Sequence, residues 1–294
     1  MFAWPMKVAG FTIIRNAVLL DYPVVEAITS VLPVCDLFVV AVGKSEDDTL
    51  QLIQSIGSPK IKIIETVWDD NLREGGRVLA VETDKAFHAI PDEYDWAFYI
   101  QSDEVLHEKY RESVQKAMAL HVSNPQVDAL LFDYLHFYGS FDFVGNSLWY
   151  RREIRIVRNN KQIFSFGDAQ GFRKLPNQKL RVKKADASIY HYGWVRTPEA
   201  MQRKNEMMHK FWHDDDWMEE NVHQKAAFDY SEFESLKRFD GTHPKVMLTR
   251  IANKNWHFDP NLSNPKLSFK NKIRLWLDEK TGYLPGEYKN FKMV

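Results

Sequence analysis

Short apolar runs and amphipathic stretches alternate along the first hundred residues of the chain. The apolar runs are four to seven residues long, which is typical of buried strands, and the stretches between them carry apolar residues at helical spacing. Strands that alternate with helices predict parallel βαβ units. Strands are therefore predicted at 8–14, 37–42, 61–64 and 96–100, and helices at 23–32, 49–56 and 79–90.

The pattern loosens after residue 104. A helix is predicted at 110–120 and strands at 127–134 and 155–158. Thr197 followed by Pro198 is a strong helix start, an N-cap with proline at the first position, and that helix runs to about residue 212. Beyond residue 253 the chain is rich in proline and predicted to be irregular, apart from an amphipathic stretch at 266–277. The prediction is an α/β fold with a mixed, mostly parallel sheet flanked by helices.

The strand at 96–100 ends abruptly in Gln101, Ser102, Asp103 and Glu104. In open α/β sheets ligands bind beyond the carboxyl ends of the strands, where several predicted turns of this chain converge. Hard carboxylate oxygens at that position suit a divalent cation and a phosphorylated substrate. Asp103 is the first candidate ligand. Glu104 is either an acceptor behind it or the cap of the following helix.

Composition narrows the class of protein. No G-x-G-x-x-G follows the first strand and no G-x-x-x-x-G-K-[ST] occurs, which argues against a dinucleotide oxidoreductase and excludes a P-loop. The net charge of -1 offers no general attraction for nucleic acid. The single cysteine, Cys35, excludes an intramolecular disulfide and fits a reducing compartment. With no bilayer-spanning run and no secretory signal, we expect a cytoplasmic protein.

Over residues 7–196 the order of motifs resembles the family 2 glycosyltransferases, which have a GT-A fold. The first strand ends near Asn16, and residues 42–49 (VGKSEDDT) resemble the loop D-x-G-S-T-D-G-T. Gln101-Ser102-Asp103 occupies the place of the acidic D-x-D motif, and His191 begins an H-Y-G motif. Two residues depart from the family pattern, because Gln101 and Val42 stand where relatives have aspartates.

The resemblance implies an inverting glycosyltransferase that moves a sugar from a nucleotide-sugar donor to a glycan, lipid-linked or protein acceptor, in surface polysaccharide or glycoconjugate assembly. It also implies Mn²⁺ or Mg²⁺ on the donor diphosphate. The departures keep a second hypothesis open, a non-catalytic nucleotide-sugar or glycan-binding protein. A nucleotidyltransferase is disfavoured because no Gly-rich basic phosphate loop lies near the first strand.

Site residues follow from the resemblance and from side-chain chemistry. Asp103 and His191 are the expected metal ligands, although His191 lies in an apolar run and could equally be a core histidine. Asp168 is the candidate general base, since relatives place an acidic segment there, and Asp133 is the alternative. Contacts with the donor are expected from Asn16, Arg73, Arg77, Gln101, Ser102, Asp103 and Arg196.

Other chemistry-bearing residues have a plainer interpretation. His209 and His213 with the acids 214–216 indicate a solvated helix end rather than a metal cluster. Tyr138, Trp149 and Trp194 are core aromatics or platforms for an acceptor sugar.

We expect a catalytic domain at 1–196, with a donor-binding half at about 1–105 and an acceptor half at about 106–196. Residues 197–294 are a helical and irregular extension packed on it. Within this extension, the face formed by Phe269, Ile273 and Trp276 at 266–277 either docks on the catalytic domain or makes a peripheral membrane contact at the inner face.

Overall fold

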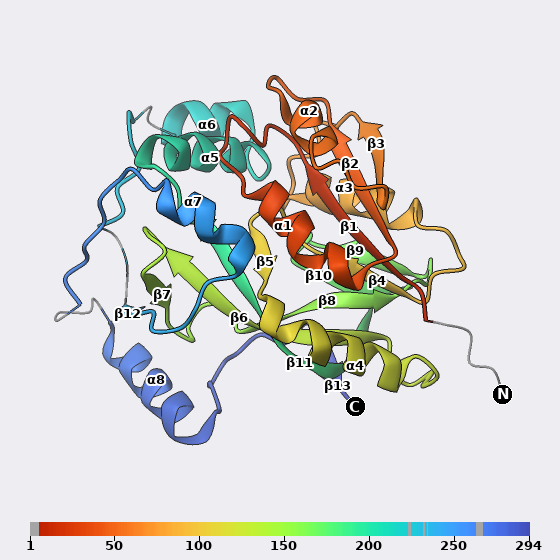
Figure 1. The fold of residues 1–294 in the computed structure, drawn as a ribbon. Coiled ribbons are helices and arrows are strands. Elements are labelled where there is room, and N and C mark those ends of the chain that lie inside the picture. Colours follow the sequence, from red (N-terminus) through yellow and green to blue (C-terminus); the bar gives the residue numbers. More distant parts are fainter. Residues whose placement is uncertain (1–5, 223–224, 232, 234, 263–266) are drawn as a thin grey trace.

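A twisted sheet flanked by helices runs through the computed structural model, which describes residues 6–222, 225–231, 233, 235–262 and 267–294 (Figure 1). Its strands are β1 (Val8–Ile14), β2 (Leu37–Gly43), β3 (Ile61–Thr66), β4 (Trp96–Tyr99), β5 (Glu104–Leu106), β6 (Ala129–Tyr138), β7 (Phe143–Gly145), β8 (Arg152–Arg158), β9 (Ile163–Phe166), β10 (Gly171–Lys174), β11 (Gln178–Trp194), β12 (Leu236–Arg238) and β13 (Phe291–Met293). Its α-helices are α1 (Val24–Val31), α2 (Thr49–Gln54), α3 (Arg77–His88), α4 (Arg111–His121), α5 (Pro198–Lys210), α6 (Asp215–Asn221), α7 (Leu248–Ala252) and α8 (Phe269–Thr281).

The central strands follow the order β3-β2-β1-β4-β8-β6-β11. The strands β1 to β4 pair in parallel, and so do β6 and β11. Strand β8 is antiparallel to both of its neighbours, β4 and β6, so all the other strands of this series point the same way. The predicted fold class, a mixed and mostly parallel sheet flanked by helices, is confirmed.

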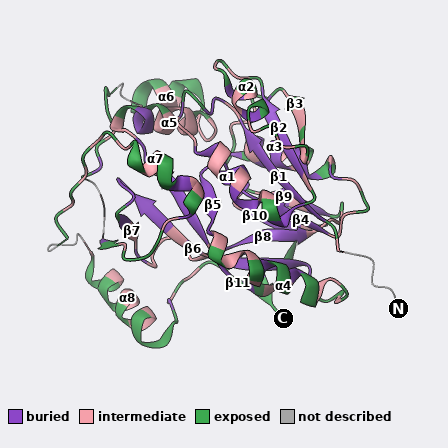
Figure 2. Ribbon diagram, viewed as in Figure 1, coloured by how far each residue is buried: buried purple, intermediate pink, exposed green. Residues whose placement is uncertain are grey.

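Each face of the sheet is covered by helices that the apolar spacing predicted. Helices α1 and α4 bury Val24, Ile28 and Met118 in one hydrophobic cluster, together with one set of alternate strand residues. On the other face α3 buries Phe87 against Phe172 of β10, with the remaining strand residues. Because both faces are covered, the central strands read as continuous apolar runs, and Figure 2 shows them buried.

The long strand β11 is the longest of the elements that the sequence analysis did not predict. Its burial alternates over the first part and becomes continuous near His191, so no single period marks it. An irregularity between Lys184 and Ser188, with Asp186 at a φ of 50°, interrupts its pairing with β6. The second surprise is the length of β6, which extends to Tyr138 and thereby places His136 opposite His191.

The C-terminal part contributes to the sheet as well as covering it. Strand β12 pairs with β7, and β13 pairs with β11, where a helical and irregular extension was predicted. Arg250 of α7 forms an ion pair with Glu26 of α1 at 3.0 Å. Helices α5 and α6 lie on the same side of the molecule as the carboxyl end of β1, whereas α8 projects from the body with no buried residue (Figures 1 and 2).

Candidate functional site

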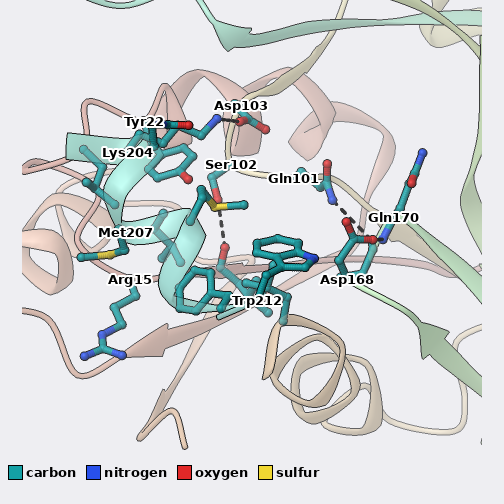
Figure 3. A pocket seen from close by; sticks show the side chains of 18 of the residues that line it. Arg15, Tyr22, Gln101, Ser102, Asp103, Asp168, Gln170, Lys204, Met207 and Trp212 are labelled. Atoms are coloured by element: carbon teal, nitrogen blue, oxygen red, sulfur yellow. Dashed lines mark hydrogen bonds and ion pairs between the residues drawn. The ribbon is translucent and has the colours of Figure 1, made fainter. Parts of the chain in front are cut away.

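A cavity of about 540 Å³ opens at the carboxyl ends of β1 and β4. Its walls come from the turn 101–103 after β4, the loop 168–170 between β9 and β10, and the inner side of α5. Asp103 and Lys204 lie together on one side, with Gln101, Asp168 and Gln170 on another (Figure 3). This is the crevice that strand direction predicted.

Glu104 builds the turn rather than facing the cavity. It is fully buried and binds Arg155 of β8 through both oxygens, at 2.8 and 2.7 Å. The hydroxyl of Tyr134 donates to the same carboxylate at 2.7 Å, and the backbone N–H of Gln101 donates at 3.1 Å. Glu104 is therefore an acceptor behind the site, one of its two expected roles, and its cap role is not observed.

Asp103 faces the cavity with 10% of its side chain exposed. Its Oδ2 accepts from the Lys204 ammonium at 3.0 Å, and its Oδ1 lies 3.7 Å from Nε2 of His191. Burial works to raise the pKa of Asp103, but the charge of Lys204, that of His191 when it is protonated, and that of Arg196 outweigh it and hold that pKa well below its usual range. The carboxylate is thus ionised at any physiological pH.

The proton on His191 can be assigned from its hydrogen bonds. Nε2 of His136 lies 2.7 Å from the carbonyl of Tyr150, so this nitrogen donates. Burial and the adjacent His191 lower the pKa of His136 to about 3, which keeps the ring neutral. Its Nδ1 must then accept from Nδ1 of His191, 2.9 Å away. His191 therefore presents an unprotonated Nε2 toward Asp103.

These two residues fit a divalent cation as a partial ligand set. Burial lowers the pKa of His191 to about 4, so its Nε2 lone pair is available at neutral pH beside the Asp103 carboxylate. Gly193 leaves room for this arrangement, because a Cβ there would lie 2.5 Å from His191 Nε2. Among the described residues no three His, Cys, Asp or Glu side chains gather for a metal, so substrate oxygens would have to complete the shell.

Asp168 lines the cavity on a strained loop. Its neighbours Gly167 and Ala169 both have positive φ values, 66° and 65°. The loop is held by Arg155, which donates to the Gln170 carbonyl at 2.8 Å, and by Gln101, whose amide donates to the Ala169 carbonyl at 3.3 Å. The buried Glu104–Arg155 pair therefore also positions the loop of Asp168. Ser102 lines the cavity too, and its hydroxyl donates to Ile13 at the end of β1.

Four expected donor or base residues lie outside the cavity lining. Asn16 is fully buried and ties the turn after β1 to the loop after β2, accepting from the N–H of Glu46 at 2.9 Å. Arg73 pairs with Asp215, and Arg77 is exposed at the start of α3. Asp133, the alternative base, pairs with Arg152 at 2.8 Å on the surface. The structure brings none of the four to the cavity wall described here.

Arg196 is fully buried beside the site rather than lining it. Its Nη1 donates to the Gly193 carbonyl at 2.7 Å, and its guanidinium lies 4.9 Å from the centre of the Tyr22 ring. Its Nε and Nη2 have no hydrogen-bond partner among the described residues.

Other expectations are settled in part by this arrangement. The acids 214–216, predicted at a solvated helix end, instead begin helix α6, which Asp214 caps by accepting from the N–H of Trp217. His209 and His213 line the cavity. Trp194 lines it as well, whereas Tyr138 packs in a buried aromatic cluster.

Sequence reasoning missed Lys204, Tyr22 and Arg15, which all line the cavity. For Lys204 a signal existed, since it follows Ala200 and Met201 at helical spacing on the inner face of α5.

Comparison with known proteins gives only distant likenesses. No protein-family model matches the sequence, and no curated protein matches it. Among solved structures, S. aureus TarS matches with a TM-score of 0.40 and 14% identity, over 69% of this chain and 39% of that one. S. aureus TarS 1-349 in complex with UDP matches with a TM-score of 0.41 and 14% identity, over 69% of this chain and 64% of that one.

Glucosyl-3-phosphoglycerate synthase from Mycobacterium tuberculosis, in complex with Mn²⁺, UDP and phosphoglyceric acid, gives a TM-score of 0.31 at 14% identity, over 45% of this chain and 44% of that one. The chain thus spans less than two thirds of the length of each of these proteins. At these scores and identities, a shared family or activity does not follow.

Proposed function

We propose that this protein is an inverting glycosyltransferase that moves a sugar from a nucleotide-sugar donor to a glycan, lipid-linked or protein acceptor. The observation that carries the proposal is the ionised Asp103 beside two cations and an unprotonated His191, in a cavity at the strand ends. In this proposal Gln101-Ser102-Asp103 is the degenerate D-x-D motif of a family 2 enzyme, and the setting is surface polysaccharide or glycoconjugate assembly.

The donor diphosphate would lie against Asp103, Ser102 and Gln101. Asp103 and His191 would hold Mn²⁺ or Mg²⁺, which when bound neutralises charge on the diphosphate. Arg196 is too deeply buried to touch it but adds positive potential, because a charge in a low-dielectric interior acts over a longer range. Arg73, Arg77 and Asn16 would contribute only if the loops that carry them move on binding.

Asp168 is the proposed base. Its carboxylate would take the proton from the acceptor hydroxyl as that oxygen bonds to the anomeric carbon, while the bond from this carbon to the diphosphate oxygen breaks. Attack from the face opposite the leaving group inverts the anomeric centre. The position of Asp168 on a different wall from Asp103 supports this division of labour (Figure 3).

The test is release of free nucleotide from a panel of UDP-, GDP- and ADP-sugars, with Mn²⁺ or with EDTA. We expect slow hydrolysis of one donor in the wild type and loss of that hydrolysis in Asp103→Ala. Asp133→Asn is the matched control, since this carboxylate lies outside the cavity lining. Saturable binding without turnover in every condition would favour the binding-protein alternative, and no binding at all would overturn both.

The extension at 197–294 is proposed to complete the catalytic domain at 1–196, because Met201, Lys204 and Trp212 form one wall of the cavity. The peripheral membrane contact stays a proposal about α8. Phe269, Ile273 and Trp276 are 79%, 44% and 57% exposed on one helical side, with lysines beside them.

No helix in the described part of the chain is long and apolar enough to cross a bilayer. Flotation with vesicles containing anionic lipid should carry the wild type upward but leave a Phe269→Ser/Trp276→Ser variant behind. Equal behaviour of the two would remove the membrane proposal.

A further inference from the structure

Lys204 stands on the buried side of an amphipathic helix. Helix α5 begins at Pro198 under the cap of Thr197, and it turns Ala200 and Met201 inward. Lys204 follows these residues by four and three positions, so it shares their face. An ordinary surface lysine would point to solvent from the other side, as the exposed Lys210 does at the end of the same helix.

The ammonium of Lys204 forms two hydrogen bonds at the site. It donates to Asp103 Oδ2 at 3.0 Å and to the Gly193 carbonyl at 2.8 Å, and only 12% of the side chain is exposed. A lysine is rarely buried this far unless it is paired, so the Asp103 contact is what keeps it there.

Positive charge exceeds negative charge around this carboxylate. Lys204 and Arg196 both approach the ring of Tyr22, at 5.3 and 4.9 Å from its centre. Asp103 supplies one negative charge against these two cations, and Arg196 adds its charge from a fully buried position behind the cavity lining. The site is therefore prepared for an additional anion.

The two oxygens of Asp103 face different partners. Oδ1 lies 3.7 Å from Nε2 of His191, where the divalent ion of the proposed function would be held, and Oδ2 accepts a hydrogen bond from Lys204. A divalent ion on Asp103 would repel the ammonium that shares the same carboxylate, because like charges at such separations oppose each other strongly in a buried site.

We propose that Lys204 is a built-in cation that competes with a divalent ion for Asp103 and pairs with the donor diphosphate once nucleotide is bound. The inference rests on the proposed function and assigns a diphosphate-binding role to a residue that sequence reasoning did not single out. The ammonium neutralises Asp103 while the cavity is empty of donor. When phosphate oxygens arrive, they offer the ammonium a second anionic partner.

The proposal predicts effects of opposite sign for one substitution. In Lys204→Met the affinity for Mn²⁺ alone should increase, by about fivefold or more, because the competing ammonium is gone. In the same variant the affinity for UDP or GDP with Mn²⁺ should fall about tenfold, because a charge-assisted contact to the diphosphate is lost. A purely structural role for Lys204 would weaken both.

The experiment measures Mn²⁺ binding by electron paramagnetic resonance and nucleotide binding by calorimetry on the full chain. Lys210→Met is the matched control, and both affinities should match those of the wild type. Lys204→Gln repeats the test if the methionine variant fails to fold. Unchanged or weaker Mn²⁺ binding in the Lys204 variants would overturn the competition, and unchanged nucleotide binding would overturn the diphosphate contact.

The proposed function and the proposed role of Lys204 can be refuted independently of each other. If the wild type binds neither UDP nor GDP while Lys204 variants still bind Mn²⁺ more tightly, the proposed function is wrong and the competition at Asp103 stands. If the wild type binds nucleotide but Lys204→Met changes neither affinity, the proposed function stands and this inference falls.

Discussion

Neighbouring carboxylates in one turn form two ion pairs of different character. Glu104 is fully buried, binds Arg155 through both oxygens and accepts two further hydrogen bonds. Asp103, one residue earlier, meets Lys204 through one oxygen and faces the cavity. The first pair is satisfied within the protein and fixes the turn. The second leaves cationic capacity unused, which is what a site for an anionic ligand requires.

Disrupting the Glu104–Arg155 pair should have the largest effect on the free energy of unfolding. Glu104→Gln leaves the Arg155 guanidinium buried opposite a neutral amide, and removing one partner of a buried pair costs about 3–5 kcal/mol. Urea unfolding should therefore show a large loss of the free energy of unfolding. Asp133→Asn, which opens the surface pair with Arg152, should cost no more than about 1 kcal/mol. Similar losses in both variants would refute the contrast.

Neutralising the other carboxylate should affect turnover more than stability. Asp103→Asn should lower the free energy of unfolding by less than Glu104→Gln does, because Lys204 keeps its hydrogen bond to the Gly193 carbonyl and part of its side chain stays exposed. Transfer should nevertheless fall by about a hundredfold or more, the scale seen when one preorganised charge contact is removed from an active site. Parallel unfolding and donor-turnover assays decide this. A large stability loss with turnover retained would place Asp103 in the structural class with Glu104.

The loop of Asp168 can be tested through a pair of adjacent glycines. Gly75 and Gly76 both have positive φ values, 58° and 69°, so alanine strains the backbone at either position, by about 1 kcal/mol. A Cβ on Gly75 meets nothing within 4 Å, whereas one on Gly76 would lie 2.7 Å from Trp212 and 2.8 Å from Asp168.

We therefore expect both variants to lose stability, but only Gly76→Ala to lose most of its turnover as well. The same unfolding and turnover assays compare the two variants. Equal turnover in Gly75→Ala and Gly76→Ala would indicate that Asp168 takes no part in the reaction.

The smallest effect concerns pH. Burial raises the pKa of Glu153 to about 8, against the pull of Arg155 and the Gln170 amide and with the repulsion of Glu104 and Asp168. A carboxyl whose pKa is raised on folding stabilises the protein fully only below its unfolded pKa, and that stability is lost as the pH rises toward 8.

Glu153→Gln should therefore gain stability relative to the wild type between pH 7 and pH 8, by about 1 kcal/mol. Thermal or urea unfolding at several pH values measures the difference. A difference that stays constant over this range would contradict the raised pKa.

The sequence predicted what local periodicity controls. The strands β1 to β4, the helices between them and the acidic turn at Asp103 all follow from apolar spacing and strand direction. Asp168 reached the cavity as expected, and Glu104 proved to be the acceptor behind it.

What the sequence could not predict depends on pairing between distant segments. Arg155 reaches Glu104 because β8 inserts antiparallel between β4 and β6, and His136 meets His191 because β6 lies beside β11. The spacing of apolar residues along the sequence does not indicate either of these strand pairings. Arg73 and Arg77 lie close in sequence to Gly76, which contacts Asp168 and Trp212 at the cavity. Neither arginine lines the cavity, and Arg73 pairs with Asp215 instead.

The central claim is that the cavity beside Asp103 binds a nucleoside diphosphate. Calorimetric titration of the wild type and Asp103→Asn with UDP and GDP in the presence of Mn²⁺ tests it most directly. We predict saturable one-site binding of at least one nucleotide to the wild type, weakened about tenfold or more by the substitution. Equal affinity in the two proteins, or no binding to the wild type, would contradict the account.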